Sequence, residues 1–388
     1  MKRTLTILFA LVLLAACQTP GKEAAYIVQV SLGTWDQPLY TAESIVSRID
    51  SVAALIPVEK VIIGWSKDKA IYKEVGEYLH SKNIKMLLWL PVFAETEGVC
   101  ESQPALDLWG RKPGNFDLTA GEGFSFNCPS TKSNQDNVLA IYDELFADCG
   151  FDGVFMDRVR CQSFVAGAGG VLSCGCPNCT ARFLEEGVDL EQVKSVLDVC
   201  GDDFFSVEGY TPEAGFQFSN KTASAFFKAK GHIVSNAVAN LCDSLHARGL
   251  EVGLDLYAPF MAPFVGQDYG ILTEHADFIK PMLYRKTNAP AGMGFEYELL
   301  RQAVPLAKGY PVFEMDVDFL ESQLKAMEPY HCGKFPGIEI NYRPDIALTS
   351  PEYVTESLAA IMAHGFDGAV LSWNIMEAPE PHIACLKN

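Results

Sequence analysis

Histidine and basic residues are scarce in this sequence of 388 residues. It contains seven histidines, and no two of them are separated by a single residue. A catalytic metal centre built on paired histidines is therefore excluded. Only 30 lysines and arginines stand against 49 aspartates and glutamates, which gives a formal net charge of −19. Because binding of DNA or RNA phosphates needs clustered lysine and arginine, the composition also excludes a nucleic-acid-binding protein.

Long apolar runs are missing too, except at the N-terminus. Lys2 and Arg3 precede an apolar run over residues 5–16, which is shorter than the roughly 20 residues of a transmembrane helix. This pattern predicts a secretory signal. The run ends in Ala15-Ala16-Cys17, which resembles the lipobox of bacterial lipoproteins. The resemblance implies lipidation of Cys17 and anchoring to a bacterial membrane, facing the periplasm or the cell surface; a soluble secreted protein cleaved nearby is the alternative.

The remaining chain predicts one large α/β domain. We expect a signal peptide over residues 1–16, a tether over 17–25 and a single domain over 26–388. Apolar, β-rich runs alternate with amphipathic runs, as in a (β/α)₈ TIM barrel. The predicted strands cover residues 26–32, 61–65, 85–91, 153–157, 251–257, 278–284, 336–342 and 368–374. The predicted helices cover residues 42–55, 67–81, 135–149, 222–248, 294–307 and 351–364, and residues 311–317 suit either a ninth strand or part of an inserted helix and loop.

The lengths of the connections predict which end of the barrel carries the site. Short turns with Gly150, Gly249 or Gly365 end helices and lead into strands. The long connections follow the third and fourth strands, after residues 91 and 157. Because the loops after the strands build the active site in such barrels, we expect the site at that end.

Three of the twelve cysteines form a compact motif, Cys174-Gly-Cys176-Pro-Asn-Cys179. Close thiolates suit a tetrahedral zinc ion, which needs a fourth ligand. Cys128, in the long loop after the third strand, is the preferred fourth ligand, with Cys161 and Cys100 as alternatives. Such a closed site would be structural and would pin the two long loops together. Disulfides remain the alternative, since an exported protein allows them.

These cysteines also carry a resemblance to a known family. Cys128-Pro-Ser130 and the three-cysteine motif resemble the zinc site of family 42 β-galactosidases, and three strand-end phrases resemble uncharacterised glycosyl-hydrolase barrels related to them: residues 151–157, 277–284 and 371–374. The resemblance implies hydrolysis of O-glycosyl bonds in an oligo- or polysaccharide, without an organic cofactor. The family has Asn-Glu at the end of strand four where this chain has Met156-Asp157, so its acid/base glutamate cannot be transferred.

Three carboxylates at predicted strand ends are candidates for catalysis. Glycoside hydrolysis normally uses two carboxyl groups beside the scissile bond. Asp157 on the fourth strand and Glu339 on the seventh form the predicted pair, in either order, and Asp255 on the fifth is the third candidate. Alternatively, Asp157 could form a structural ion pair, and Glu339 could point outward. Asp152 and Asp367 precede strands and are predicted to be turn residues.

Aromatic and polar residues near the same strand ends are candidates for carbohydrate binding. Aromatic rings offer faces for stacking on sugars, although core packing is their commoner role. The predicted binding residues are Trp35, Trp89, Glu95, Tyr257, Asp268, Lys280, Tyr284, Asn341, Trp373 and Asn374, and Trp65 lies close to them. Two rival functions stay open: a carbohydrate-binding lipoprotein without catalysis, and a lyase that uses Lys280 to form a Schiff base.

Overall fold

The computed structural model describes residues 23–94, 102–113 and 125–387. The predicted signal peptide, most of the tether, Cys17, Glu95 and Cys100 lie outside these residues, so the structure places none of them. Among the described residues, no helix has both the length and the apolarity that crossing a membrane requires.

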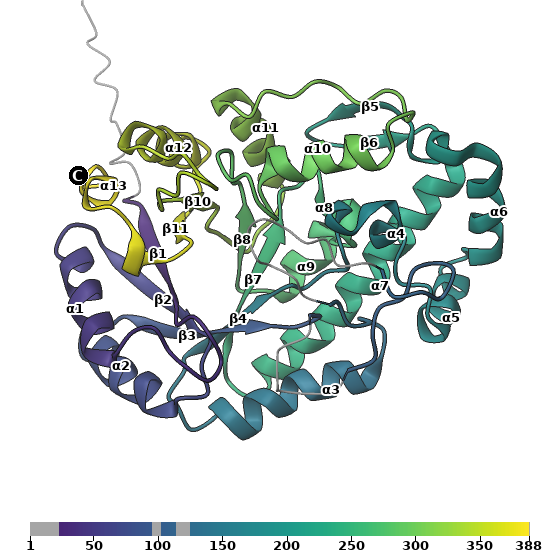
Figure 1. The fold of residues 1–388 in the computed structure, drawn as a ribbon. Helices are drawn as coiled ribbons and strands as arrows, with labels where there is room; N and C mark the ends of the chain where they lie inside the picture. Colours follow the sequence, from purple (N-terminus) through teal and green to yellow (C-terminus); the bar gives the residue numbers. More distant parts are fainter. Residues whose placement is uncertain (1–22, 95–101, 114–124, 388) are drawn as a thin grey trace, which may run out of the picture.

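Eight parallel strands form a closed barrel, which confirms the predicted α/β fold (Figure 1). Every predicted strand is present, within a few residues of the predicted ends. The barrel strands, in order around the barrel, are β1 (Ala25–Ser31), β2 (Val58–Gly64), β3 (Lys85–Pro91), β4 (Gly153–Asp157), β7 (Glu251–Tyr257), β8 (Phe278–Met282), β10 (Gly337–Glu339) and β11 (Gly368–Ser372). Pairing of β10 with β8 and of β11 with β1 closes the barrel, and the two-residue β9 (Gly333–Lys334) extends the edge of β8.

Helices surround the barrel, and most begin at a side chain that accepts a backbone hydrogen bond. Thr41, Asp68, Asn220 and Ser350 play this role before α1, α2, α7 and α12. The outer helices are α1 (Ala42–Ala53), α2 (Lys69–Ser81), α3 (Lys132–Ile141, continued as a π-helix over Tyr142–Phe146), α7 (Lys221–His246), α9 (Tyr269–His275), α10 (Met293–Ala303), α11 (Val317–Met327), α12 (Pro351–Ala363) and α13 (Glu380–Ala384). Residues 311–316 form no strand but a loop that leads into α11.

The barrel interior is packed, and its two ends differ. Apolar side chains from the strands and from the segment between β9 and β10 fill the middle: Ile27, Ile62, Leu87, Phe155, Phe278, Phe335 and Val370. At the lower end, Gly150 and Gly365 have φ values of 80° and 72° and end their helices tightly, as predicted. Asp152 and Asp367 accept hydrogen bonds from Met86 and Lys334 there, which confirms them as turn residues.

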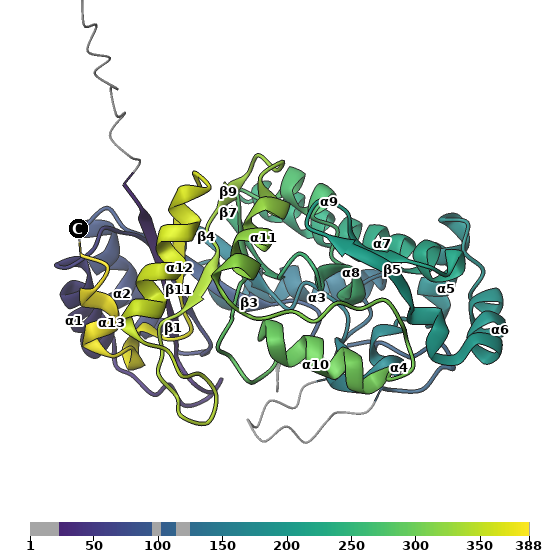
Figure 2. The same cartoon turned by 90° about the horizontal axis from the view of Figure 1, so that it is seen from above.

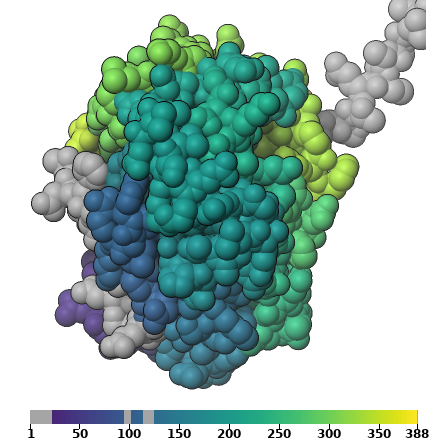
Figure 3. Space-filling view, turned by 90° about the vertical axis from the view of Figure 1, so that its right-hand side faces the viewer, coloured from purple at the N-terminus to yellow at the C-terminus, as the bar shows by residue number. Residues whose placement is uncertain are grey.

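The connection after β4 is a small subdomain on one side of the barrel (Figure 2). The sequence predicted its length but not its elements: α4 (Gly167–Val171), α5 (Pro177–Glu185), α6 (Leu190–Cys200) and the antiparallel hairpin of β5 (Val207–Thr211) and β6 (Gly215–Phe218). The short α8 (Ala262–Val265) follows β7. In the space-filling view, the teal segment that includes this connection forms most of one face (Figure 3).

Candidate functional site

A cavity of about 480 Å³ opens at the carboxyl ends of the strands, the end that the loop lengths predicted. Eight of the predicted site residues line it: Trp89, Asp157, Asp255, Lys280, Tyr284, Asn341, Trp373 and Asn374. Trp65 lines it as well. Because these residues lie in or directly after seven strands that are far apart in the sequence, the closed barrel is what brings them together.

Asp157 is held at the end of β4 by two donors. The indole Nε1 of Trp89 donates to its Oδ2 at 3.1 Å, and the amide of Arg158 donates to its Oδ1 at 2.5 Å. Its side chain is partly exposed and lines the cavity. From the sequence, Asp157 could also form an ion pair with Arg158, Arg160 or Arg285; of these, Arg285 binds Glu356 on α12 instead. Asp157 is thus a fixed carboxylate that a ligand can reach.

Asp255 lies beside Asp157 on the neighbouring strand. The register pairs Met156 with Leu254, so the next residues, Asp157 and Asp255, are level, on strands about 4.8 Å apart. Asp255 Oδ2 accepts a hydrogen bond from Lys280 Nζ at 2.9 Å, and both side chains are buried. Its Oδ1 is buried without a hydrogen-bond partner among the described residues.

Burial sets the charge state of this pair. Burial raises the pKa of Asp255 to about 7; Lys280 opposes the rise, and the charge of Asp157 adds to it. Burial alone would lower the pKa of Lys280, but the carboxylate of Asp255 and the phenol of Tyr284 hold it above its ordinary value. Lys280 is therefore a charged ammonium near neutral pH.

Glu339 does not line this cavity, contrary to the predicted pairing with Asp157. It is fully buried, and its Oε1 accepts from the amides of Lys286 and Thr287 at 2.8 and 3.0 Å and from the Thr287 hydroxyl at 3.0 Å. Its Oε2 accepts from the Tyr353 hydroxyl on α12. Burial raises the pKa of Glu339, although these donors oppose the rise. The carboxylate thus joins the loop after β8 to α12, and the geometry moves the second carboxylate of the site from Glu339 to Asp255.

The aromatic residues divide between the cavity and the packing around it. Trp373 and Tyr284 meet edge to face at 6.3 Å between ring centroids, at the cavity wall. Trp35, predicted to bind substrate, instead packs against Trp65 and Phe146 and does not line the cavity. The sequence predicted that Trp35 lies in the loop after β1. The direction of its side chain depends on the contact with Phe146, in the π-helix that continues α3.

The two asparagines at the cavity fix the loop that carries Trp373. Asn341 Oδ1 accepts from the amides of Trp373 and Asn374, and its Nδ2 donates to the Asn374 carbonyl. Asn374 Oδ1 accepts from the amides of Ser31 and Met376. Both side chains are buried, so in this structure they position the loop that carries Trp373.

Two predicted binding residues lie elsewhere. Tyr257 is buried and donates to Glu296 at 2.7 Å, outside the cavity wall. Asp268 caps α9 by accepting from the Gly270 amide, the ordinary turn role. These positions correct both predictions. Glu95 lies outside the described residues.

Sequence reasoning missed several polar residues of the cavity. Gln29, Ser31, Arg160, Thr287, Arg343 and Glu377 line it but were not predicted to bind substrate. Ser31 ends β1, and Glu377 follows Trp373 in the same loop, so both carried the positional signal used for the other residues. Thr287 and Arg343 lie inside loops whose path the sequence does not reveal.

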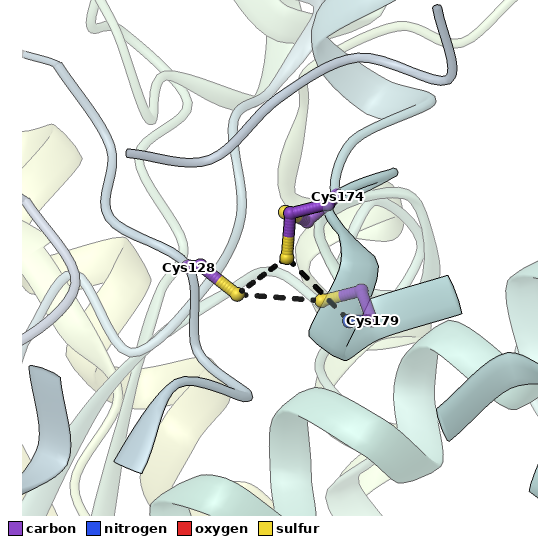
Figure 4. A group of neighbouring side chains, drawn as sticks. Cys128, Cys174 and Cys179 are labelled. Carbon is purple, nitrogen blue, oxygen red and sulfur yellow. Dashed lines mark hydrogen bonds between the residues drawn. The ribbon is translucent and has the colours of Figure 1, made fainter. Parts of the chain in front are cut away.

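Four buried cysteines converge between the two long loops, as predicted. Cys128 precedes α3, Cys174 and Cys176 precede α5, and Cys179 lies in its first turn. Their sulfurs all lie within 4.8 Å of one another, and Figure 4 shows Cys128, Cys174 and Cys179 pointing toward one point. The Sγ atom of Cys128 lies 3.3 Å from that of Cys176 and 3.4 Å from that of Cys179, and both distances exceed the length of a disulfide bond.

The donor set of this cluster fits a metal ion. Sulfurs 2.3 Å from a tetrahedral zinc would lie about 3.8 Å apart, close to the spacing found. The Leu106 amide points at Cys174 Sγ at 3.4 Å, and the Cys179 amide points at Cys176 Sγ at 3.5 Å, as donors to thiolates do. Hydrogen bonds among the thiols lower the pKa of Cys176 and raise the pKa of Cys174 and Cys179, so the four thiols interact closely. The cluster can therefore hold an ion.

Comparisons with known proteins identify the fold. No family model matches the chain, and no curated protein does. The structure is similar to the glycoside hydrolase domain of PgaB (BpsB) from Bordetella bronchiseptica, with a TM-score of 0.61 and 14% identity over 95% of this chain and 98% of that one. It is also similar to α-L-fucosidase isoenzyme 2 from Paenibacillus thiaminolyticus (TM-score 0.54, 12% identity, 92% and 48% covered) and to a class V chitinase from Pseudomonas fluorescens Pf-5 (TM-score 0.51, 10% identity, 94% and 98% covered). At these identities the similarity establishes a shared barrel fold.

Proposed function

We propose that this protein hydrolyses glycosidic bonds of an oligo- or polysaccharide in the cavity at the carboxyl ends of the strands. The observation that carries the proposal is the position of Asp157, a fixed and reachable carboxylate beside the Asp255–Lys280 pair and close to the Trp373 and Tyr284 rings. The solved structures that share the barrel are named as glycoside hydrolases, which supports the same reaction class.

Asp157 is the acid and base in this proposal. Its protonated form gives its proton to the glycosidic oxygen as the bond from that oxygen to the anomeric carbon breaks. Water then adds to the sugar, and the Asp157 carboxylate takes the proton that the water loses. Trp89 holds the carboxylate in place through both states, because its indole N–H can donate to either form.

Asp255 supports this reaction through its charge. The sugar develops positive charge at the anomeric carbon in the transition state. An ionised carboxylate next to Asp157 stabilises that charge, and Lys280 favours the ionised form at neutral pH. Because Asp255 is only 4% exposed, we assign it this supporting role rather than attack on the sugar.

The two rival functions make different demands on the same residues. A Schiff base needs an uncharged Lys280 amine, and the ion pair with Asp255 opposes that state. A protein that only binds carbohydrate would need the aromatic wall but not Asp157. Turnover therefore separates the hydrolase from a binding protein.

The test is a screen of oligosaccharides for release of new reducing ends by the lipid-free domain. We expect Asp157→Asn to lower turnover at least about 100-fold, the range of general acid catalysis. Asp268→Asn is the matched control, because Asp268 lies outside the cavity and asparagine also caps helices well. Equal turnover by Asp157→Asn and the wild type would refute the proposal, and unchanged sugar binding without any release would support a binding protein.

We infer that the four-cysteine cluster holds a structural zinc ion. All four positions would be filled by protein, which leaves no open position for chemistry. Metal analysis of purified protein should give about one zinc per chain. Cys176→Ser should lose it, whereas Cys385→Ser, a cysteine outside the cluster, should keep it. Metal-free wild-type protein that retains four free thiols would contradict this.

We propose, finally, that Cys17 carries a lipid that anchors the domain to a bacterial membrane. The support is the lipobox-like end of the N-terminal apolar run. Labelled palmitate should enter the wild type and not Cys17→Ser, with Cys385→Ser as the control. Labelling of Cys17→Ser at the wild-type level would exclude this anchor.

A further inference from the structure

One arginine in the cavity is buried and has no acidic partner in the part of the chain that the structure describes. Arg160 is 7% exposed and lines the cavity. Its Nη1 donates to the Cys161 carbonyl at 3.0 Å, which uses one of its five N–H donors. Within residues 23–94, 102–113 and 125–387, no carboxylate forms an ion pair with it. Asp255, the acid that its charge influences, is already paired with Lys280.

Two aromatic rings hold the guanidinium of Arg160 in place. Its central carbon lies 4.6 Å from the centre of the Tyr257 ring and 4.7 Å from the centre of the Phe126 ring. Stacking fixes the plane of a guanidinium and leaves its N–H edge free for a planar acceptor. Tyr257 is itself fixed by Glu296. Arg160 is thus oriented before any ligand arrives.

Burying a charge without a partner costs free energy of folding. The free N–H edge of Arg160 therefore indicates a ligand that binds there. Two other cations of the cavity form ion pairs with acidic residues. Lys280 binds Asp255, and Arg343 binds Asp345. A carboxylate or sulfate is the acceptor that matches the two parallel donors of an arginine. In a chain of net charge −19, such a site is unexpected unless the ligand is an anion.

We propose that the cavity takes a glycan that carries an acidic substituent, a carboxylate or a sulfate ester, and that Arg160 binds this group with two hydrogen bonds. The inference rests on the proposed function only in taking the ligand to be a glycan. It adds the class of substrate, which the reaction type does not specify, and it makes Arg160 a specificity-determining residue.

The test measures binding separately from turnover. In an Asp157→Asn background, titration calorimetry compares tetrasaccharides of galacturonic acid, mannuronic acid and hyaluronan with their methyl esters, and a chondroitin sulfate tetrasaccharide with its desulfated form. At least one ligand should bind tenfold or more tightly than its esterified or desulfated counterpart, a difference of 1.4 kcal/mol in binding free energy. Arg160→Gln should reduce that preference to less than threefold. Arg160→Lys, which keeps the charge but not the paired donors, should retain part of it.

The controls separate this inference from the proposed function. Arg182→Gln makes the same change of charge on the surface, where Arg182 pairs with Glu185, and should leave the preference intact. An acidic preference that survives Arg160→Gln, or equal binding of both forms in every pair, overturns the inference. If Arg160→Gln does not fold, Arg160→Lys with an undiminished preference overturns it as well. Acidic preference without cleavage by the wild type would refute the hydrolase alone, and cleavage without the preference would refute this inference alone.

Discussion

Glu339 offers a sharp test of which carboxylates form the site, because a catalytic and a structural carboxylate respond differently to the same substitution. Glu339→Gln keeps the shape and one oxygen but removes the acid. In the structure, that oxygen can still accept from Lys286 and Thr287, and the new amide can donate to Tyr353. Glu339→Leu keeps the volume and removes every acceptor.

The expected losses of stability follow from the groups that bind Glu339. Burial raises the pKa of Glu339, so folding disfavours its charged form relative to the unfolded chain, and a neutral glutamine avoids that cost. We expect Glu339→Gln to cost no more than about 1 kcal/mol of unfolding free energy. Glu339→Leu leaves two amides and the hydroxyls of Thr287 and Tyr353 without this acceptor. At about 1–3 kcal/mol for each unsatisfied group, the four groups together should cost at least about 4 kcal/mol of unfolding free energy.

Urea unfolding and turnover, measured on the same samples, provide the assay. Turnover of Glu339→Gln should stay within a few-fold of the wild type, whereas a catalytic carboxylate would lose it at least about 100-fold with stability unchanged. That second result would refute the structural role. A raised carboxyl pKa means that Glu339 stays protonated to a higher pH in the folded state than in the unfolded state. The wild type should therefore lose stability as pH rises from about 4.3 through the folded-state pKa. Glu339→Gln should lack this loss.

Three further outcomes are expected. Turnover of the wild type should rise with pH through about 7 as Asp255 ionises. Asp255→Asn should turn over more slowly and should lack this rise in the pH–rate profile. An unchanged rise in Asp255→Asn would assign the ionisation to another group. Trp373→Ala should raise KM about tenfold or more with a smaller change in kcat if its ring binds sugar, whereas Trp35→Ala, outside the cavity, should lower stability and leave KM unchanged. A chelator should lower the thermal midpoint of the wild type but not that of Cys176→Ser, and equal effects on both would place the metal elsewhere.

The fold could be predicted because the strands carry a strong local signal. Parallel strands buried on both faces are continuous apolar runs, and each is bounded by a turn residue such as Gly150 or Gly365. Many of the elements that were missed lie in the connection after β4, and α8, α9, α11 and α13 were missed as well. There α5, α6 and the β5–β6 hairpin are short, and they are stabilised by packing on α7 rather than by their own periodicity.

The site was predictable only where a strand continues to its end without a bend. Asp157 follows the interior residue Phe155 by two positions, and alternation carries it into the cavity. Glu339 was predicted from its place at the end of the seventh strand, two positions after Gly337, which faces Lys280 and Tyr284. The pairing with Asp157 failed because β10 ends at Glu339 and the loop after β8 supplies three donors at that point.

The cysteine cluster and Asp157 are joined by a short path through the backbone, which gives the cluster a reason to lie where it does. The Val92 amide bonds to the Asp157 carbonyl at 2.9 Å, and one residue on, the Phe93 carbonyl accepts from the amide of Asn127. Asn127 precedes Cys128, the cysteine that the loop after β3 contributes to the cluster. A metal that fixed Cys128 would therefore restrain the segment beside Asp157. Without such a restraint, a loop of this length would have the conformational freedom to move the wall of the cavity away from the acid.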